Sequence, residues 1–192
     1  MQHKKSSSGG SSAQGAAPAL DCSLESLAQQ RTPGQFCLGL SRLFRVRQTE
    51  VALLRLEHGL LKFLFPVELQ TAGAIPLSSS TAIAAHTATS KKVELYNSFL
   101  KVKHASVFES VKLSHPEETD KWEQPPIQRL MSAPVLDAGA TVLGVVQICR
   151  KGLDLLSSGP EFTLEDLRQL ESAASLAARS DFMRAGRGSS AI

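Results

Sequence analysis

The chain has 192 residues, of which 42% are hydrophobic and 20% are charged, as expected for one globular domain with loose ends. A net charge of +3 is too low for the dense basic face of a generic nucleic-acid binder. No apolar run approaches the ~20 residues that span a bilayer, so we expect neither a nucleic-acid partner nor a membrane.

The two ends of the chain differ in composition from its middle. Residues 1–20 are rich in Ser, Gly, Ala and Gln, which bury too little apolar surface to offset the entropy of ordering. They are predicted to be a disordered tail, and residues 185–192 are predicted to fray in the same way. One domain over residues 21–184 remains. Because the N-terminus lacks the apolar block of a secretory signal, we expect a cytoplasmic protein.

The domain is predicted to open with two helices and a hairpin. Residues 23–30 form the first helix, and residues 33–46 form the second, with a proline in its first turn and apolar residues at helical spacing. A strand over residues 50–57 is followed by a glycine suited to a tight turn. Apolar and polar residues then alternate over residues 61–69, which predicts a strand, and Pro66 indicates an edge or a bulge.

The middle of the chain carries weaker signals. Residues 71–79 are predicted to be a loop, and residues 80–89 a helix of small residues that permit close packing on a sheet or a ligand. Residues 93–113 are expected to hold a strand and a short helix, and residues 114–126 an exposed acidic loop.

A second hairpin is clearer, with strands over residues 129–136 and 141–150 joined by a turn at Gly139. The second of these strands is almost wholly apolar from Val142 to Cys149, which predicts a central strand covered on both faces.

The final helix has the strongest local signal. Thr163 is a predicted N-cap with Asp166 three residues later, a variant of the capping box, and Phe162 and Leu167 form a predicted hydrophobic staple. The helix is expected to run from Leu164 toward Arg184.

The order of these elements resembles that of a GAF domain. Residues 132–152 resemble that family's final hairpin, in which a Pro-Val strand, a Gly turn and a Gly-Val-x-Gln strand are followed by Asn-Lys. Residues 80–89 resemble the helix over its pocket. The resemblance covers residues 24–183 and implies an α+β, profilin/PAS-like fold, with an antiparallel sheet of five or six strands and helices on both faces.

Members of the family bind cyclic nucleotides, tetrapyrroles, amino acids or other metabolites, or bind nothing and dimerise. Lys151, Phe162 and Asp166 match its Asn-Lys…Phe-x-x-x-Asp-Glu signature, in which the Lys and the Asp close a supporting ion pair. The resemblance therefore implies a structural role for these three residues. Arg150 replaces the Asn and Leu167 replaces the Glu, which disfavours a cyclic nucleotide.

The cysteines argue against a GAF-like redox enzyme. Cys22, Cys37 and Cys149 are odd in number and form no CxxC pair, so they are expected to be buried thiols and not a metal site. The cysteine trio of methionine-sulfoxide-reducing relatives is missing, since no cysteine lies between Cys37 and Cys149. We find no catalytic constellation and expect no metal; the sequence names no cofactor.

Three groups of residues are candidates for ligand binding. Ser79, Ser80 and Thr81 offer hydroxyls and backbone N–H groups for an anion at a predicted helix start, although ordinary capping explains them equally well. His86 is a pocket donor or, in the favoured interpretation, a partly exposed helix histidine. The lysines Lys101 and Lys103 belong to a lid over an anionic ligand or, again favoured, to a solvated loop.

We therefore expect a GAF-type sensory module that binds a small cytosolic ligand, dimerises, or both, and signals to a separate output protein. The alternative is a ligand-free dimerisation domain. Phe182 and Met183, two large apolar residues at the polar end of the last helix, predict a homodimer through the terminal helices. The competing interpretation is that Phe182 folds back onto the first helix of its own chain.

Overall fold

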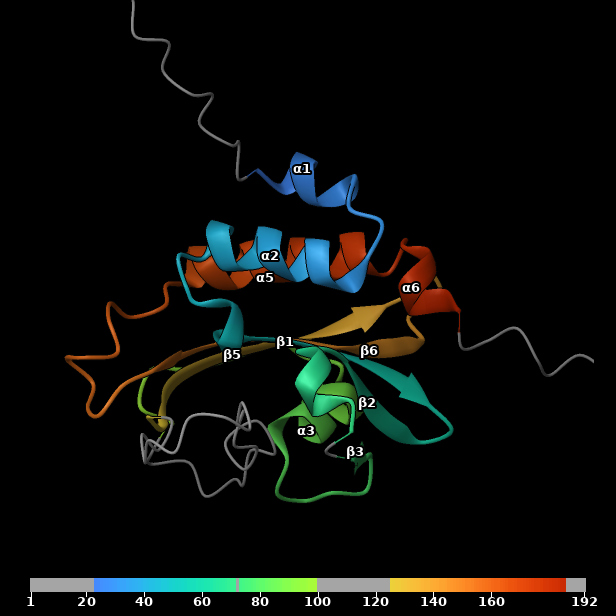
Figure 1. Ribbon diagram of the computed structural model, residues 1–192. Coiled ribbons are helices and arrows are strands. Elements are labelled where there is room, and N and C mark those ends of the chain that lie inside the picture. Colours follow the sequence, from blue (N-terminus) through green and yellow to red (C-terminus); the bar gives the residue numbers. More distant parts are fainter. Residues whose placement is uncertain (1–22, 72, 100–124, 186–192) are drawn as a thin grey trace, which may run out of the picture.

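The computed structural model describes residues 23–71, 73–99 and 125–185, which form one antiparallel sheet with helices on both faces (Figure 1). The strands are β1 (Val51–Glu57), β2 (Leu60–Phe65), β3 (Ala74–Pro76), β4 (Glu94–Tyr96), β5 (Ile127–Leu136) and β6 (Val142–Lys151). The helices are α1 (Leu24–Ala28), α2 (Pro33–Leu43), α3 (Ile83–Ser90), α5 (Leu164–Ala177) and α6 (Asp181–Arg184), with 3-10 turns at η1 (Gln48–Glu50) and η2 (Val67–Leu69).

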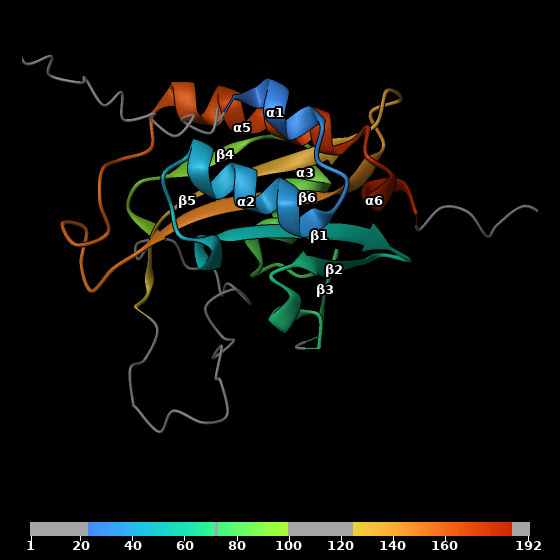
Figure 2. The ribbon, with the colours of Figure 1, turned by 45° about the horizontal axis from the view of Figure 1, so that its top comes forward.

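The six strands lie in the order β3-β2-β1-β6-β5-β4, and each neighbouring pair is antiparallel. The three-residue strands β3 and β4 form the two edges. Helices α2 and α5 lie side by side on one face with α1 on top of them, and α3 covers the other face (Figures 1 and 2). This architecture confirms the predicted α+β fold.

Alternation along the central strands divides the core into two apolar layers. Leu53 and Val146 pack toward α2 and α5, whereas their neighbours Leu54 and Val145 pack toward α3. All four are fully buried, and burial of such a side chain stabilises the fold by about 1.5–3 kcal/mol. Because β6 lies between β1 and β5 and beneath helices on both faces, the predicted central strand is confirmed.

The first hairpin turns at His58 and Gly59, whose φ angles are +49° and +79°. Two successive left-handed residues match the twist of a two-residue hairpin, and glycine adopts this conformation without steric cost. The second strand ends at Phe65, earlier than the predicted residue 69. Pro66 has no N–H to donate to the ladder, and the chain continues into η2.

Two predicted boundaries before α3 are wrong. The loop predicted over residues 71–79 contains β3, which pairs with β2 and buries Ile75. The helix predicted to begin at Ser80 begins at Ile83, because Ala82 is extended and serves as its N-cap. Three residues are too few to show a period of two, and the Ser/Thr run before the helix resembles a cap.

The predicted capping box of the last helix is confirmed. The Asp166 backbone N–H donates to Thr163 Oγ1 over 3.0 Å, and the Thr163 N–H donates to Asp166 Oδ2 over 2.7 Å. These two bonds satisfy backbone donors that have no partner inside the helix.

The prediction of one helix running toward Arg184 is wrong. Helix α5 ends at Ala177, and Ser180, in an extended conformation, leads into the separate turn α6. The Phe182 ring lies 5.8 Å from the Phe36 ring of α2, and Met183 is buried. Neither side chain is left in solvent, because the break in the helix turns both back onto the core of their own chain.

Several predictions concern residues outside the described ranges. Strand β4 accounts for the strand expected within residues 93–113. The part of that segment beyond residue 99 lies outside the described residues. Cys22 and the acidic loop up to residue 124 also lie outside them. The predicted tail over residues 1–20 also lies outside it, as does the tail over residues 185–192 apart from Ala185.

Candidate functional site

A group of polar side chains interrupts the apolar layer between α3 and the sheet. Ser132 on β5 and Gln147 on β6 are cross-strand partners, and Thr87 projects from α3 onto them. All three are buried in a layer that otherwise consists of aliphatic, aromatic and cysteine side chains. A buried polar group costs free energy unless it is hydrogen-bonded, so these residues need one another or a neighbour.

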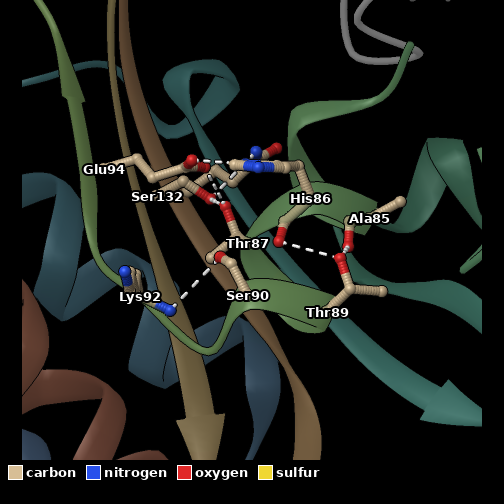
Figure 3. Close-up of polar contacts among 9 residues, drawn as sticks. Ala85, His86, Thr87, Thr89, Ser90, Lys92, Glu94 and Ser132 are labelled. Atoms are coloured by element: carbon tan, nitrogen blue, oxygen red, sulfur yellow. Dashed lines mark hydrogen bonds and ion pairs between the residues drawn. The ribbon is translucent and has the colours of Figure 1, made fainter. Parts of the chain in front are cut away.

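Hydrogen bonds connect the three residues to the carboxylate of Glu94 on β4 (Figure 3). Gln147 Nε2 donates to Ser132 Oγ over 3.2 Å, and the Thr87 hydroxyl lies 2.7 Å from both Ser132 Oγ and Glu94 Oε2. A carboxylate only accepts, so Thr87 gives its single hydroxyl proton to Glu94, and Ser132 donates to Thr87. The donors therefore all point from the sheet toward Glu94.

Glu94 has a further partner toward the surface. His86 Nδ1 lies 2.5 Å from Glu94 Oε1, and the His86 side chain is 58% exposed, whereas that of Glu94 is 11% exposed. Burial raises the pKa of the nearby Tyr96, and the charge of Glu94 raises it further. Among the described residues, no Lys or Arg forms an ion pair with Glu94.

The cluster of Thr87, Ser132, Gln147 and Glu94, hereafter the Glu94 cluster, thus holds a carboxylate by neutral donors and one exposed imidazole. Such a carboxylate attracts an N–H donor or a cation and repels an anion. His86, the neighbour that bonds Oε1, is exposed, whereas Thr87, which bonds Oε2, is buried.

The structure places the predicted ligand-binding residues in different locations. His86 borders the Glu94 cluster, and its side chain is exposed, as in the favoured interpretation. Ser79, Ser80 and Thr81 lie in the segment before α3 and do not form its first turn; the Ser79 and Thr81 hydroxyls are 3.4 Å apart. The predicted Lys101 and Lys103 lie outside the described residues.

Sequence reasoning missed the four members of the Glu94 cluster. A usable signal was nevertheless present, since Ser132 and Gln147 are the polar residues within the apolar stretches 130–136 of β5 and 142–149 of β6. Pairing these positions requires the register of β5 against β6, and connecting them to Thr87 and Glu94 requires the placement of α3 and β4.

Of the three residues with a predicted structural role, Phe162 packs in the layer beneath α2 and α5 and Asp166 lies in α5, whereas Lys151 is the last residue of β6. Lys151 is buried, and its backbone N–H donates to Glu50 Oε1 over 2.7 Å. Phe162 is buried and Asp166 caps its own helix. No ion pair within the described ranges joins Lys151 to Asp166, whose Oδ2 accepts from both the backbone and the hydroxyl of Thr163.

Arg150 ties the end of β6 to the helices. Its guanidinium lies 4.6 Å from the centre of the Phe162 ring and donates to the carbonyl oxygens of Phe44 and Arg45 at the end of α2. A cation suits the carbonyl end of a helix and the face of an aromatic ring. Burial lowers the pKa of Arg150, and the charges of Glu50 and Asp166 oppose that shift.

Two features are absent from the described ranges. None of the helices is both long and apolar enough to cross a membrane. No group of three or more His, Cys, Asp or Glu side chains is close enough to hold a metal ion.

Comparison with known proteins shows similarity in structure and not in sequence. Neither a protein-family model nor a curated protein matches the chain. The GAF domain of an Acinetobacter phosphoenolpyruvate-protein phosphotransferase matches with a TM-score of 0.59 and 10% identity, covering 88% of this chain and 92% of that one. The corresponding domain from Coxiella burnetii matches with a TM-score of 0.55 and 12% identity, covering 84% and 89%.

A methyl-accepting chemotaxis protein matches with a TM-score of 0.52 and 14% identity, covering 81% of this chain and 92% of that one. Identities this low show a shared fold alone. The resemblance noted in the sequence therefore extends to the arrangement of the whole described domain.

Proposed function

We propose that this chain, which has the fold of GAF domains, is a non-enzymatic sensory module that binds a small cytosolic ligand at the Glu94 cluster. The ligand presents an N–H donor or a cationic group to Glu94 Oε1 and displaces His86. We place the protein in the cytoplasm, where a separate output protein reads the bound state. The structural neighbours from phosphotransferase and chemotaxis proteins support a signalling role.

The environment of the Glu94 carboxylate carries this proposal. Removing a carboxylate from water costs several kcal/mol unless partners compensate, and a fixed Arg or Lys is the usual partner. Glu94 is instead supported by hydroxyls and by an imidazole that is charged only when protonated. A carboxylate held in this way keeps an unused capacity for a cation. We therefore propose a cationic or N–H-donating ligand, and not the anionic ligand that the sequence suggested for Ser79–Thr81 and for Lys101 and Lys103.

The test is mass spectrometry of the natively purified protein and of its Glu94→Gln variant. A near-stoichiometric metabolite is expected on the wild type and is expected to be lost from the variant, because Gln presents a neutral amide in place of the charge. Ser80→Ala, a change at an exposed residue before α3, is the matched control and should retain the metabolite. An equal yield on both variants, or no metabolite on the wild type, would overturn the proposal.

Ligand-free dimerisation is the second candidate, and one observation favours it. Leu153 and Leu156 are 84% and 93% exposed on the loop after β6. Bonds between the backbone and side chain of Asp154 and those of Ser157 hold this loop in a defined turn. Two large apolar side chains on an ordered surface turn are suited to burial against a second copy.

A redox activity is disfavoured by the thiols in the described residues. Cys37 and Cys149 are both fully buried, and burial raises the pKa of the Cys37 thiol far above its ordinary value. Because the thiolate is the reactive form, a thiol of this kind is inert.

A further inference from the structure

A cleft of about 140 Å³ lies on the face of the molecule opposite to the Glu94 cluster. It opens between α1 and the junction of α5 with α6, where α1 lies on the outer side of α2 and α5 (Figure 2). Its floor is apolar and includes Leu27, Phe36 and Leu176, of which the first two are buried. Its polar lining includes Arg31, which follows α1, and Arg179, which follows α5.

The charges at the rim are unbalanced. Arg31 and Arg179 are exposed, and neither takes part in an ion pair among the described residues. Asp181 also lines the cleft but pairs with neither of them in the described structure. Two guanidinium groups against one carboxylate leave a local excess of one positive charge.

We propose that this cleft is a second ligand site, which binds a small organic anion with an apolar body, such as a ring-sized carboxylate. The apolar part lies on Leu27, Phe36 and Leu176, and the carboxylate lies between Arg31 and Arg179. The planar fork of a guanidinium matches the two oxygens of a carboxylate. The volume is similar to the roughly 150 Å³ of an engineered apolar cavity that accepts benzene.

The same site joins α1 to the rest of the domain. Helix α1 has five residues, with Leu27 as its buried side chain, and a helix this short is not stable alone. Leu27 fits against Gly39 of α2, where an added Cβ would overlap the Leu27 Cδ2 atom. An anion that bridges Arg31, just after α1, and Arg179, just after α5, therefore holds α1 against the helical face. This inference is independent of the Glu94 cluster.

The experiment is a titration of the ¹⁵N-labelled full chain with benzoate, followed by amide chemical shifts. Benzyl alcohol and benzylamine, which carry the ring without the negative charge, are titrated in parallel. Benzoate is expected to give saturable shifts at residues of the cleft, and the other two compounds to bind at least about tenfold more weakly, as the loss of a charge-assisted hydrogen bond implies.

Matched variants test whether the two rim arginines bind the carboxylate of benzoate. Replacing both rim arginines, Arg31→Gln with Arg179→Gln, should weaken benzoate binding at least tenfold and leave the spectrum that of a folded protein. Arg168→Gln removes an exposed arginine of α5 that is not part of the cleft and should leave the affinity unchanged.

Three results would overturn the proposal. Equal binding of benzylamine and benzoate would remove the role of the arginines, and shifts that persist in the double variant would place the anion elsewhere. Shifts at the same amides that follow protein concentration without any benzoate would assign the cleft to contact with a second copy instead.

Discussion

Thr87 is the residue on which the buried polar group depends, because its hydroxyl is the link between the sheet and Glu94. Thr87→Val keeps the shape and removes that link. The buried Ser132 hydroxyl then loses its acceptor, and the free energy of unfolding should fall by about 1–3 kcal/mol. Urea denaturation measures the loss.

Thr89→Val on the same helix is the control for this substitution. The Thr89 hydroxyl is exposed and bonds to the Ala85 carbonyl of its own helix, so its loss should change stability by less than about 0.5 kcal/mol. Similar losses of unfolding free energy for both variants would show that the buried Thr87 hydroxyl stabilises the fold no more than the exposed Thr89 hydroxyl does.

Glu57 gives the protein a defined sensitivity to acid. Hydrogen bonds from Lys62 and then from Arg55 lower the pKa of Glu57 below its ordinary value of 4.5. Protonation of Glu57 therefore destabilises the folded state relative to the unfolded chain. The stabilisation from the ionised carboxylate is present above the ordinary pKa of 4.5, and it is lost as the pH falls through the lower pKa of the folded state. Urea denaturation from pH 7 downward should show a smaller acid loss for Glu57→Gln than for the wild type.

The exposed Glu68 is the matched control, since Glu68→Gln should keep the acid loss of the wild type. Protonation of Glu57 should also weaken the attachment of α6, because Arg55 donates to both Glu57 and the Phe182 carbonyl. Identical acid profiles for the wild type and Glu57→Gln would contradict the assignment.

At this scale, the sequence identified features whose partners are close along the chain. The Thr163–Asp166 box joins residues three positions apart, and the His58–Gly59 turn joins two neighbours, so residue type alone indicates the geometry. The Glu94 cluster contains a direct hydrogen bond between residues 45 positions apart, Thr87 and Ser132. Such a group is not visible until the strands have a register.

Among the elements, α5 depends on the bonds at its start. Thr163→Ala removes one half of the capping box and should lower the free energy of unfolding by about 0.5–2 kcal/mol. Ser172→Ala, in the middle of the same helix and exposed, should be nearly neutral by the same denaturation measurement. A neutral Thr163→Ala variant would show that the box adds nothing to the folded state.

Strand β6 should be the least tolerant element of the domain. Val146 is fully buried against Leu53 and Ala133 of the adjacent strands, so Val146→Asp places an unpaired charge in the core. A loss of about 3–5 kcal/mol, or failure to fold, is expected. Val67→Asp introduces the same charge at an exposed position and should melt within a few degrees of wild type, as thermal unfolding would reveal.

The strands that the sequence located best are the long ones. β5 and β6 each have ten residues and an apolar pattern, whereas β3 and β4 have three residues each. A three-residue edge strand is formed by the strand beside it and not by its own propensity, so β3 was missed. The break after Ala177 was missed for a related reason: no Pro or Gly marks it.

For the molecule as a whole, a homodimer remains a prediction, but the residues on which it rests are different from those predicted from the sequence. Phe182 and Met183 pack within their own chain, so Phe182→Lys should now destabilise the fold instead of separating a dimer. A dimer is expected to use the exposed leucines of the loop after β6. Sedimentation velocity should show the wild type as a dimer and the double variant Leu153→Ser with Leu156→Ser as a monomer.

Leu155 lies between those two leucines, and its carbonyl oxygen accepts from the buried Arg129. It is therefore left unchanged. A wild type that sediments as a monomer at every concentration would remove the dimer, and a double variant that remains dimeric would move the interface elsewhere.

The sheet separates the Glu94 cluster from the apolar layer beneath α2 and α5 by the thickness of one strand backbone. On β5, Ser132 faces the Glu94 cluster, while its neighbours Met131 and Ala133 pack toward α2 and α5. Adjacent residues of one strand share a rigid peptide plane, so a displacement at Ser132 is also a displacement at Met131 and Ala133. We therefore expect a substitution that shifts the backbone at Ser132 to alter the packing of Met131 and Ala133 beneath α2 and α5 as well.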